Sequence, residues 1–106
     1  MNLIIHEIHP EETENLNDWG EKLMTERREE AIKTLEQENV EMEAVFLVEL
    51  EGKTYFIGID ETGKGGHDPV DMSEDINQKH KKILNKAFKN KKVAEGKLVY
   101  KLENKN

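Results

Sequence analysis

Hydrophobic residues recur along this chain in blocks whose spacing alternates between two periods. Residues 2–8, 40–50, 53–60 and 97–103 are apolar or alternate apolar with polar positions, and each run is short. This pattern predicts four strands. The Glu-Gly pair at residues 51–52 is a tight-turn signal, so it predicts that the two central strands form a hairpin.

Two longer segments have the spacing of helices. From about residue 11 to about residue 38, and again from residue 73 or 77 to about residue 90, apolar side chains return at steps of three and four. Pro10 suits the first turn of the first helix. Gly20 lies within that helix, and we expect it to bend or loosen the helix there.

The resulting order is β-α-β-β-α-β, which predicts an α+β fold of the ferredoxin-like kind. Such a fold has a four-stranded antiparallel sheet with both helices on one face. A length of 106 residues fits one domain, so residues 1–106 are interpreted as a single unit, ending in a polar tail at 104–106.

The second strand carries apolar residues on both faces. Val45 and Leu47 alternate with Phe46 and Val48, whereas a solvated face would be plainly polar. We therefore expect a second sheet to cover the open face, giving a homodimer in the form of a dimeric α+β barrel. Val45, Leu47 and Phe56 are predicted to lie at or near that contact.

Composition indicates the cellular compartment and the classes of binding partner that can be expected. The absence of cysteine excludes disulfides and thiolate sites, and no apolar run approaches the ~20 residues that span a bilayer. A cytoplasmic protein without membrane contact is the default expectation. Residues 1–78 carry a net charge of −15 and residues 79–106 carry +8, so these parts should attract each other. The acidic total of −7 argues against nucleic-acid binding.

Two loop segments resemble sequence motifs of known ligand sites, but each lacks a residue that its motif requires. The stretch from Gly58 to Gly65 nearly spells a phosphate loop but lacks the Ser or Thr after Lys64. Residues 60–71 have the length of a calcium loop, but Lys64 stands where an oxygen ligand is needed. We therefore predict neither a metal nor a cofactor.

The candidate chemistry rests on histidines and carboxylates. His6, Glu43 and His80 are candidate catalytic residues, because a His–carboxylate pair in a partly closed pocket can exchange protons. A carboxylate on an otherwise apolar face is costly unless it is paired or used. By strand parity we expect the site on the sheet face away from the helices, with Glu43 or Glu49 near His6 or Lys101. The candidate ligand-binding residues are Arg28, Glu49 and Lys101. The alternatives are a polar rim at the dimer interface and surface salt bridges from the arginines to Glu30 or Glu36.

The segment TERREEAIKTLEQENVEMEAVFLVELEGKTYFIGI, followed by DINQKH, resembles a small bacterial family of unknown function. The resemblance runs from about Trp19 to Phe88 and departs at Asn77, where the family pattern has Asp. More widely, the chain is similar to dimeric α+β barrel proteins, which include antibiotic-biosynthesis-type monooxygenases. This resemblance implies the fold and a dimer, but no particular chemistry.

Two functional hypotheses remain open at this point. The first is a homodimeric binding or structural module whose barrel can hold a small-molecule ligand. The second is a small cofactor-free enzyme of the monooxygenase-like or isomerase-like type, using His6, Glu43 and His80. A pocket lined by both His and Glu would favour the enzyme, and a packed apolar seam would favour the module.

Overall fold

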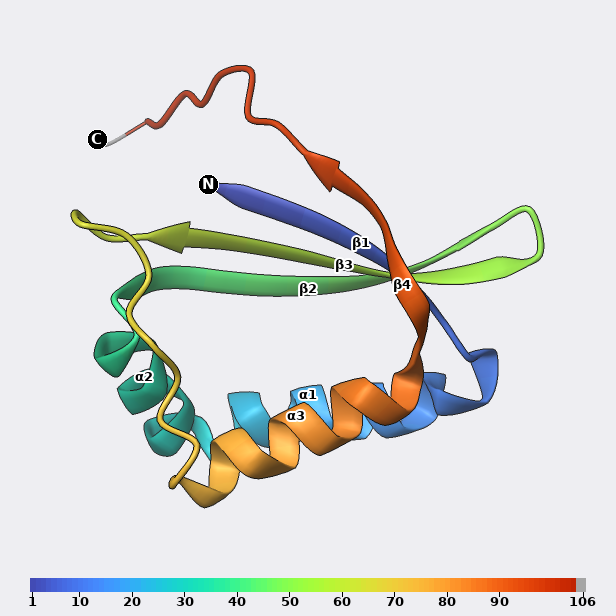
Figure 1. Ribbon diagram of the computed structural model, residues 1–106, viewed down its shortest axis with the longest axis horizontal. Coiled ribbons are helices and arrows are strands. Elements are labelled where there is room, and N and C mark those ends of the chain that lie inside the picture. The colour runs from blue at the N-terminus through green and yellow to red at the C-terminus, as the bar shows by residue number, and fades with distance from the viewer. Residues whose placement is uncertain (105–106) are drawn as a thin grey trace.

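The computed structural model describes residues 1–104, apart from the side chain of residue 91; the last part of the predicted tail lies outside this range. The chain forms an antiparallel sheet with its helices on one side (Figure 1). The elements in chain order are β1 (Asn2–Ile8), a 3-10 turn (Pro10–Glu12), α1 (Thr13–Met24), α2 (Arg28–Gln37), β2 (Val40–Leu50), β3 (Lys53–Thr62), α3 (Asp75–Ala87) and β4 (Phe88–Gly96). The α+β prediction is confirmed.

The predicted first helix is two helices, and this corrects the sequence interpretation. Helix α1 continues through Gly20, and the break lies at Thr25, whose backbone leaves the helical region. The Thr25 hydroxyl donates to the carbonyl oxygen of Glu21 at 2.7 Å, and the backbone N–H of Arg27 donates to the carbonyl of Lys22 at 2.9 Å. A side chain that bonds back to the preceding turn competes with helix continuation.

The strand order is β2-β3-β1-β4, and β1 lies antiparallel to both β3 and β4. Residues that face each other across two strands share a sheet face. His6 therefore shares a face with Phe56, and Phe56 shares it with Leu47. This face carries the core, because Phe56 is buried and Leu47 packs against the cluster around it.

The prediction that Val45, Leu47 and Phe56 lie on the open face was therefore wrong. Strand parity grouped these residues correctly, but the group faces the helices. The face that the helices leave uncovered instead carries Phe46 and Val48, which are 54% and 38% exposed. Both faces of β2 are apolar, so alternation alone did not indicate which one the helices cover.

The core lies between the sheet and helices α1 and α3. Ile8 and Ala87 are completely buried, and Leu16 and Phe56 complete the cluster. The ring of Phe88 meets Phe56 edge to face, with centroids 5.0 Å apart. Phe88 thereby fixes the point where α3 ends and the last strand begins.

The last strand lies earlier in the chain than the sequence predicted. Strand β4 follows α3 directly, because Phe88 already has extended backbone angles, so the helix ends at Ala87 rather than near residue 90. Gly96 closes the strand beside Leu3, where a Cβ atom would lie 2.9 Å from a side-chain carbon of Leu3. Residues 97–104, predicted to contain the final strand, are not part of the sheet and run on the side opposite the helices (Figure 1).

Candidate functional site

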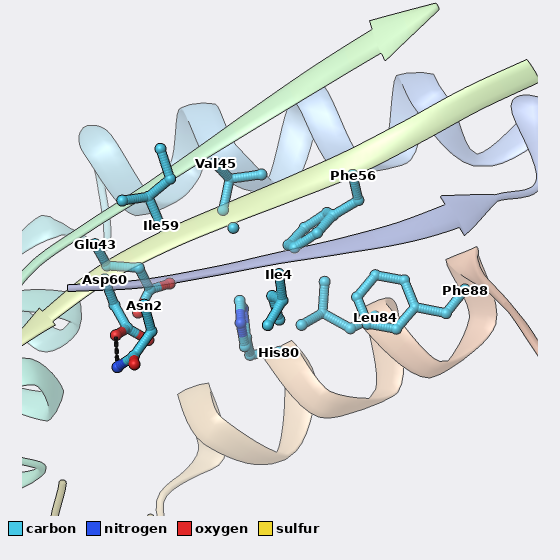
Figure 2. Close-up of a pocket in the computed structure, with 11 residues that line it drawn as sticks. Asn2, Ile4, Glu43, Val45, Phe56, Ile59, Asp60, His80, Leu84 and Phe88 are labelled. Atoms are coloured by element: carbon cyan, nitrogen blue, oxygen red, sulfur yellow. Dashed lines mark hydrogen bonds between the residues drawn. The ribbon is translucent and has the colours of Figure 1, made fainter. Parts of the chain in front are cut away.

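A cavity of about 210 Å³ lies between the sheet and α3. Figure 2 shows carboxylate and amide groups gathered at one end of it and aromatic and aliphatic side chains at the other. The lining residues come from all four strands and α3, and they are Asn2, Ile4, Glu43, Val45, Phe56, Gly58, Ile59, Asp60, His80, Leu84 and Phe88.

The register of the sheet builds the acidic end of this cavity. Asp60 on β3 lies opposite Asn2 on one side and opposite Glu43 on the other, so the three side chains share a face. The amide of Asn2 donates to a carboxylate oxygen of Asp60 at 2.8 Å. Asn2 thereby orients Asp60. Glu43 is more exposed than Asp60 and also lines the cavity, and the described lining holds no side chain of opposite charge.

His80 on α3 faces this acidic end, and its ring is oriented by Trp19 of α1. The indole N–H of Trp19 donates to Nδ1 of His80 at 2.9 Å. Because an indole nitrogen can only donate, Nδ1 must be the acceptor, and the proton of the neutral ring is on Nε2. Nε2–H is therefore the group that His80 can offer to a bound molecule.

Burial of the His80 ring lowers its pKa below the ordinary value, and the nearby Glu43 carboxylate acts in the opposite direction. The Trp19 hydrogen bond requires an unprotonated Nδ1, so it also favours the neutral ring. His80 is thus a neutral hydrogen-bond donor next to a carboxylate. The described lining contains no Lys or Arg, so the polar end is negative or neutral in charge.

Trp19 is also the point where the three helices meet. It is 4% exposed, and the guanidinium of Arg27 and the ammonium of Lys79 lie 5.7 Å and 5.6 Å from its ring centre. Arg27 in turn contacts Glu30 at 2.9 Å and Asp75 at 3.1 Å. These contacts position α3, and with it His80, over the sheet.

His6, the third candidate for acid–base chemistry, lies apart from Glu43. It stands opposite Phe56, whereas Glu43 stands opposite Asp60, four residues further along β3. The His6 ring stacks on Phe88, with centroids 4.1 Å apart, and its buried Nδ1 atom has no hydrogen-bond partner among the described atoms. Burial and the charge of Lys92 lower its pKa.

The three ligand-binding candidates also lie outside the cavity. Arg28 is exposed at the start of α2, and Glu49 lies opposite Thr54, at the far end of β2 from Glu43. Lys101 forms ion pairs with Glu61 at 2.6 Å and Glu103 at 2.5 Å, and these pairs raise its pKa. The expectation that Glu43 or Glu49 meets His6 or Lys101 on the face away from the helices is therefore corrected.

Of the six candidates, the structure brings together Glu43 and His80. Sequence reasoning missed Asn2, Asp60 and Trp19. Asn2 and Asp60 lie at the cavity because of the strand register, which cannot be read from the sequence. Trp19 was interpreted only as part of an apolar helix face. Within residues 1–104, no three His, Cys, Asp or Glu side chains are grouped closely enough to hold a metal ion.

The comparison with protein families decides what this chain is related to. The profile of one family, described as a family of unknown function (DUF6176), matches residues 1–106. The chain belongs to DUF6176. The DUF6176 match is longer than the expected stretch from Trp19 to Phe88, and it includes both His80 and the residues at the acidic end of the cavity. No curated protein matches the chain, and no solved structure does.

Membership in DUF6176 brings no activity with it, so chemistry must be argued from the cavity itself. Of the helices in residues 1–104, none is long and apolar enough to cross a membrane.

Proposed function

We propose that this protein is a homodimeric small-molecule-binding module whose ligand is a small amine with an apolar body. The observation that carries the proposal is the polarity of the cavity. Glu43 and Asp60 lie at one end with His80, and Phe56, Leu84 and Phe88 line the other end. Among the described side chains, no Lys or Arg lines the space. Such a lining complements a cationic head joined to a hydrophobic group.

The size of the cavity limits the ligand. An engineered protein cavity of about 150 Å³ holds benzene, so a space of about 210 Å³ suits a ligand of roughly that size with a short polar extension. The ammonium group would be placed between Glu43 and Asp60. The neutral His80 would offer Nε2–H to an acceptor on the same ligand, while the aromatic rings contact its body.

The order β2-β3-β1-β4 with helices on one face supports the ferredoxin-like assignment. Exposed Phe46, Val48 and Leu50 on the opposite face support a homodimer in which two sheets pack together as an α+β barrel. In this proposal the ligand cavities lie between sheet and helices in each subunit, and the sheet interface lies on the other side.

A thermal-shift screen with matched fragments tests the binding function. Benzylamine and cyclohexylamine should raise the midpoint of unfolding, whereas benzoate and cyclohexanecarboxylate should not. Hydrogen bonds to charged groups contribute about 1.5–3 kcal/mol, so Glu43→Gln should weaken binding of the amine about tenfold or more. Glu41→Gln, two residues away and outside the cavity lining, is the matched control. Equal responses to amines and carboxylates would reject the proposed ligand class.

The second candidate function is cofactor-free acid–base catalysis in the same cavity. The specific observation in its favour is the Trp19–His80 hydrogen bond, which presents Nε2–H as a proton donor near the Glu43 carboxylate. Turnover of a bound amine or of a related carbonyl compound, lost in both Glu43→Gln and His80→Gln, would favour this alternative over a binding module.

A further inference from the structure

Residues 97–103, here called the C-terminal segment, carry large apolar side chains that are exposed. Val99 is 88% exposed, Tyr100 74% and Leu102 87%. The sequence KLVYKLE alternates in the way that strands do, yet none of residues 97–104 belongs to the sheet. A strand-like sequence with exposed large side chains is a surface that fits a partner.

The edge strand β2 has the complementary features. It forms one border of the sheet, and within residues 1–104 no strand pairs with its outer side. Its uncovered face carries Phe46, Val48 and Leu50, all more than a third exposed. Strand β2 also contains three glutamates and no basic residue, whereas the C-terminal segment contains Lys97 and Lys101 and one acidic residue, Glu103. Both the apolar and the charged groups are therefore matched.

The C-terminal segment cannot pair as a strand with the β2 edge of its own chain. It begins after Gly96 at the β4 border, which β1 and β3 separate from β2. By Lys101 it has reached Glu61 near the end of β3, at 2.6 Å. The residues used to cross the sheet cannot also run along its far edge. A second copy of the chain offers a β2 edge without this constraint.

We propose that the C-terminal segment of one subunit adds as a strand to the β2 edge of a second copy, and that the exchange is reciprocal. This inference rests on the homodimer of the proposed function and specifies how its subunits are joined. A two-fold dimer would make the contact twice, and each copy would bring part of its basic region to the acidic region of the other. The ion pair between Lys101 and Glu61 is replaced in the exchange, and a partly exposed pair of this kind contributes little.

Disulfide trapping tests the contact directly, because the chain has no cysteine of its own. One preparation carries Tyr100→Cys. A second preparation, of different mass through a tag, carries Phe46→Cys, Val48→Cys or Leu50→Cys. All four positions are exposed, so folding should be retained, and three β2 positions allow for an unknown register. The two chains are mixed, allowed to exchange subunits and oxidised.

The expected result is a disulfide between the two different chains with at least one of the β2 positions. Val70→Cys, on an exposed loop, replaces the β2 variants as the matched control and should give no such product. Dimers that sediment normally, or that cross-link through Phe46→Cys on both chains, without any link to position 100 would overturn the strand exchange and leave the sheet dimer standing. Monomers throughout would overturn both.

Discussion

The indole N–H of Trp19 donates a hydrogen bond to Nδ1 of His80 at 2.9 Å, and this joins α1 to α3 at the cavity. The bond determines which nitrogen of His80 carries the proton. The bond also holds α3, which carries His80, in place over the sheet, which carries Glu43 and Asp60.

Replacing Trp19 by Phe keeps an aromatic ring but removes the donor. Nδ1 of His80 would lose its partner in a half-buried position, so we expect the free energy of unfolding to fall by about 1–3 kcal/mol. The pKa of His80 should rise, because the bond favours the neutral ring. Urea denaturation and NMR titration measure both effects. In a double-mutant cycle, the variant carrying both His80→Gln and Trp19→Phe should lose less free energy of unfolding than the two single variants lose together. Additive losses of free energy would mean that the two residues are not coupled.

Stability should depend on pH through His80. Because burial lowers the pKa of folded His80 below 6.5, the unfolded chain binds a proton between the two values that the folded chain does not. The contribution of His80 to the free energy of unfolding is therefore fully present above about pH 6.5 and is lost as the pH decreases below that value. His6 contributes with the same sign. His80→Gln should make the difference between unfolding free energies at pH 7.5 and pH 5.5 smaller, and an unchanged difference would contradict the stated role of burial.

Adjacent residues on β2 should respond differently to the same substitution. Phe46 is 54% exposed on the open face, so Phe46→Lys should leave the chain folded and shift sedimentation from dimer to monomer. Leu47 packs against the cluster around Phe56, so Leu47→Lys should unfold the chain, because an unpaired charge in a core is costly. If both variants were folded dimers, both the assigned faces and the proposed interface would be wrong.

The sequence predicted the sheet better than it predicted the faces of the sheet. Alternation along β2 correctly grouped Glu43, Val45 and Leu47, but the opposite group is equally apolar, so which group the helices cover depended on packing. The last strand was misplaced for a related reason. Strand β4 is rich in lysine, while residues 97–103 have the better alternation, and β4 forms because α3 delivers Phe88 to the edge of β1.

Half of the candidate site could be found from residue type and half could not. Glu43 and His80 stood out as ionisable groups among apolar neighbours. Asn2 and Asp60 did not, because their position at the cavity follows from a register that pairs them across strands 58 residues apart in the chain. His6 has the right chemistry but lies in the row of Phe56, where it stacks on Phe88.

Binding of an amine in the cavity between the sheet and α3 is tested most directly by locating where a small amine binds. Benzylamine is titrated into ¹⁵N-labelled protein, and the backbone amide shifts are followed by two-dimensional NMR. We expect saturable shifts centred on Glu43, Asp60 and His80, with little change at Phe46 and Val48 on the opposite face. Shifts confined to the open face, or none at these residues at millimolar amine, would contradict an amine-binding cavity between the sheet and α3.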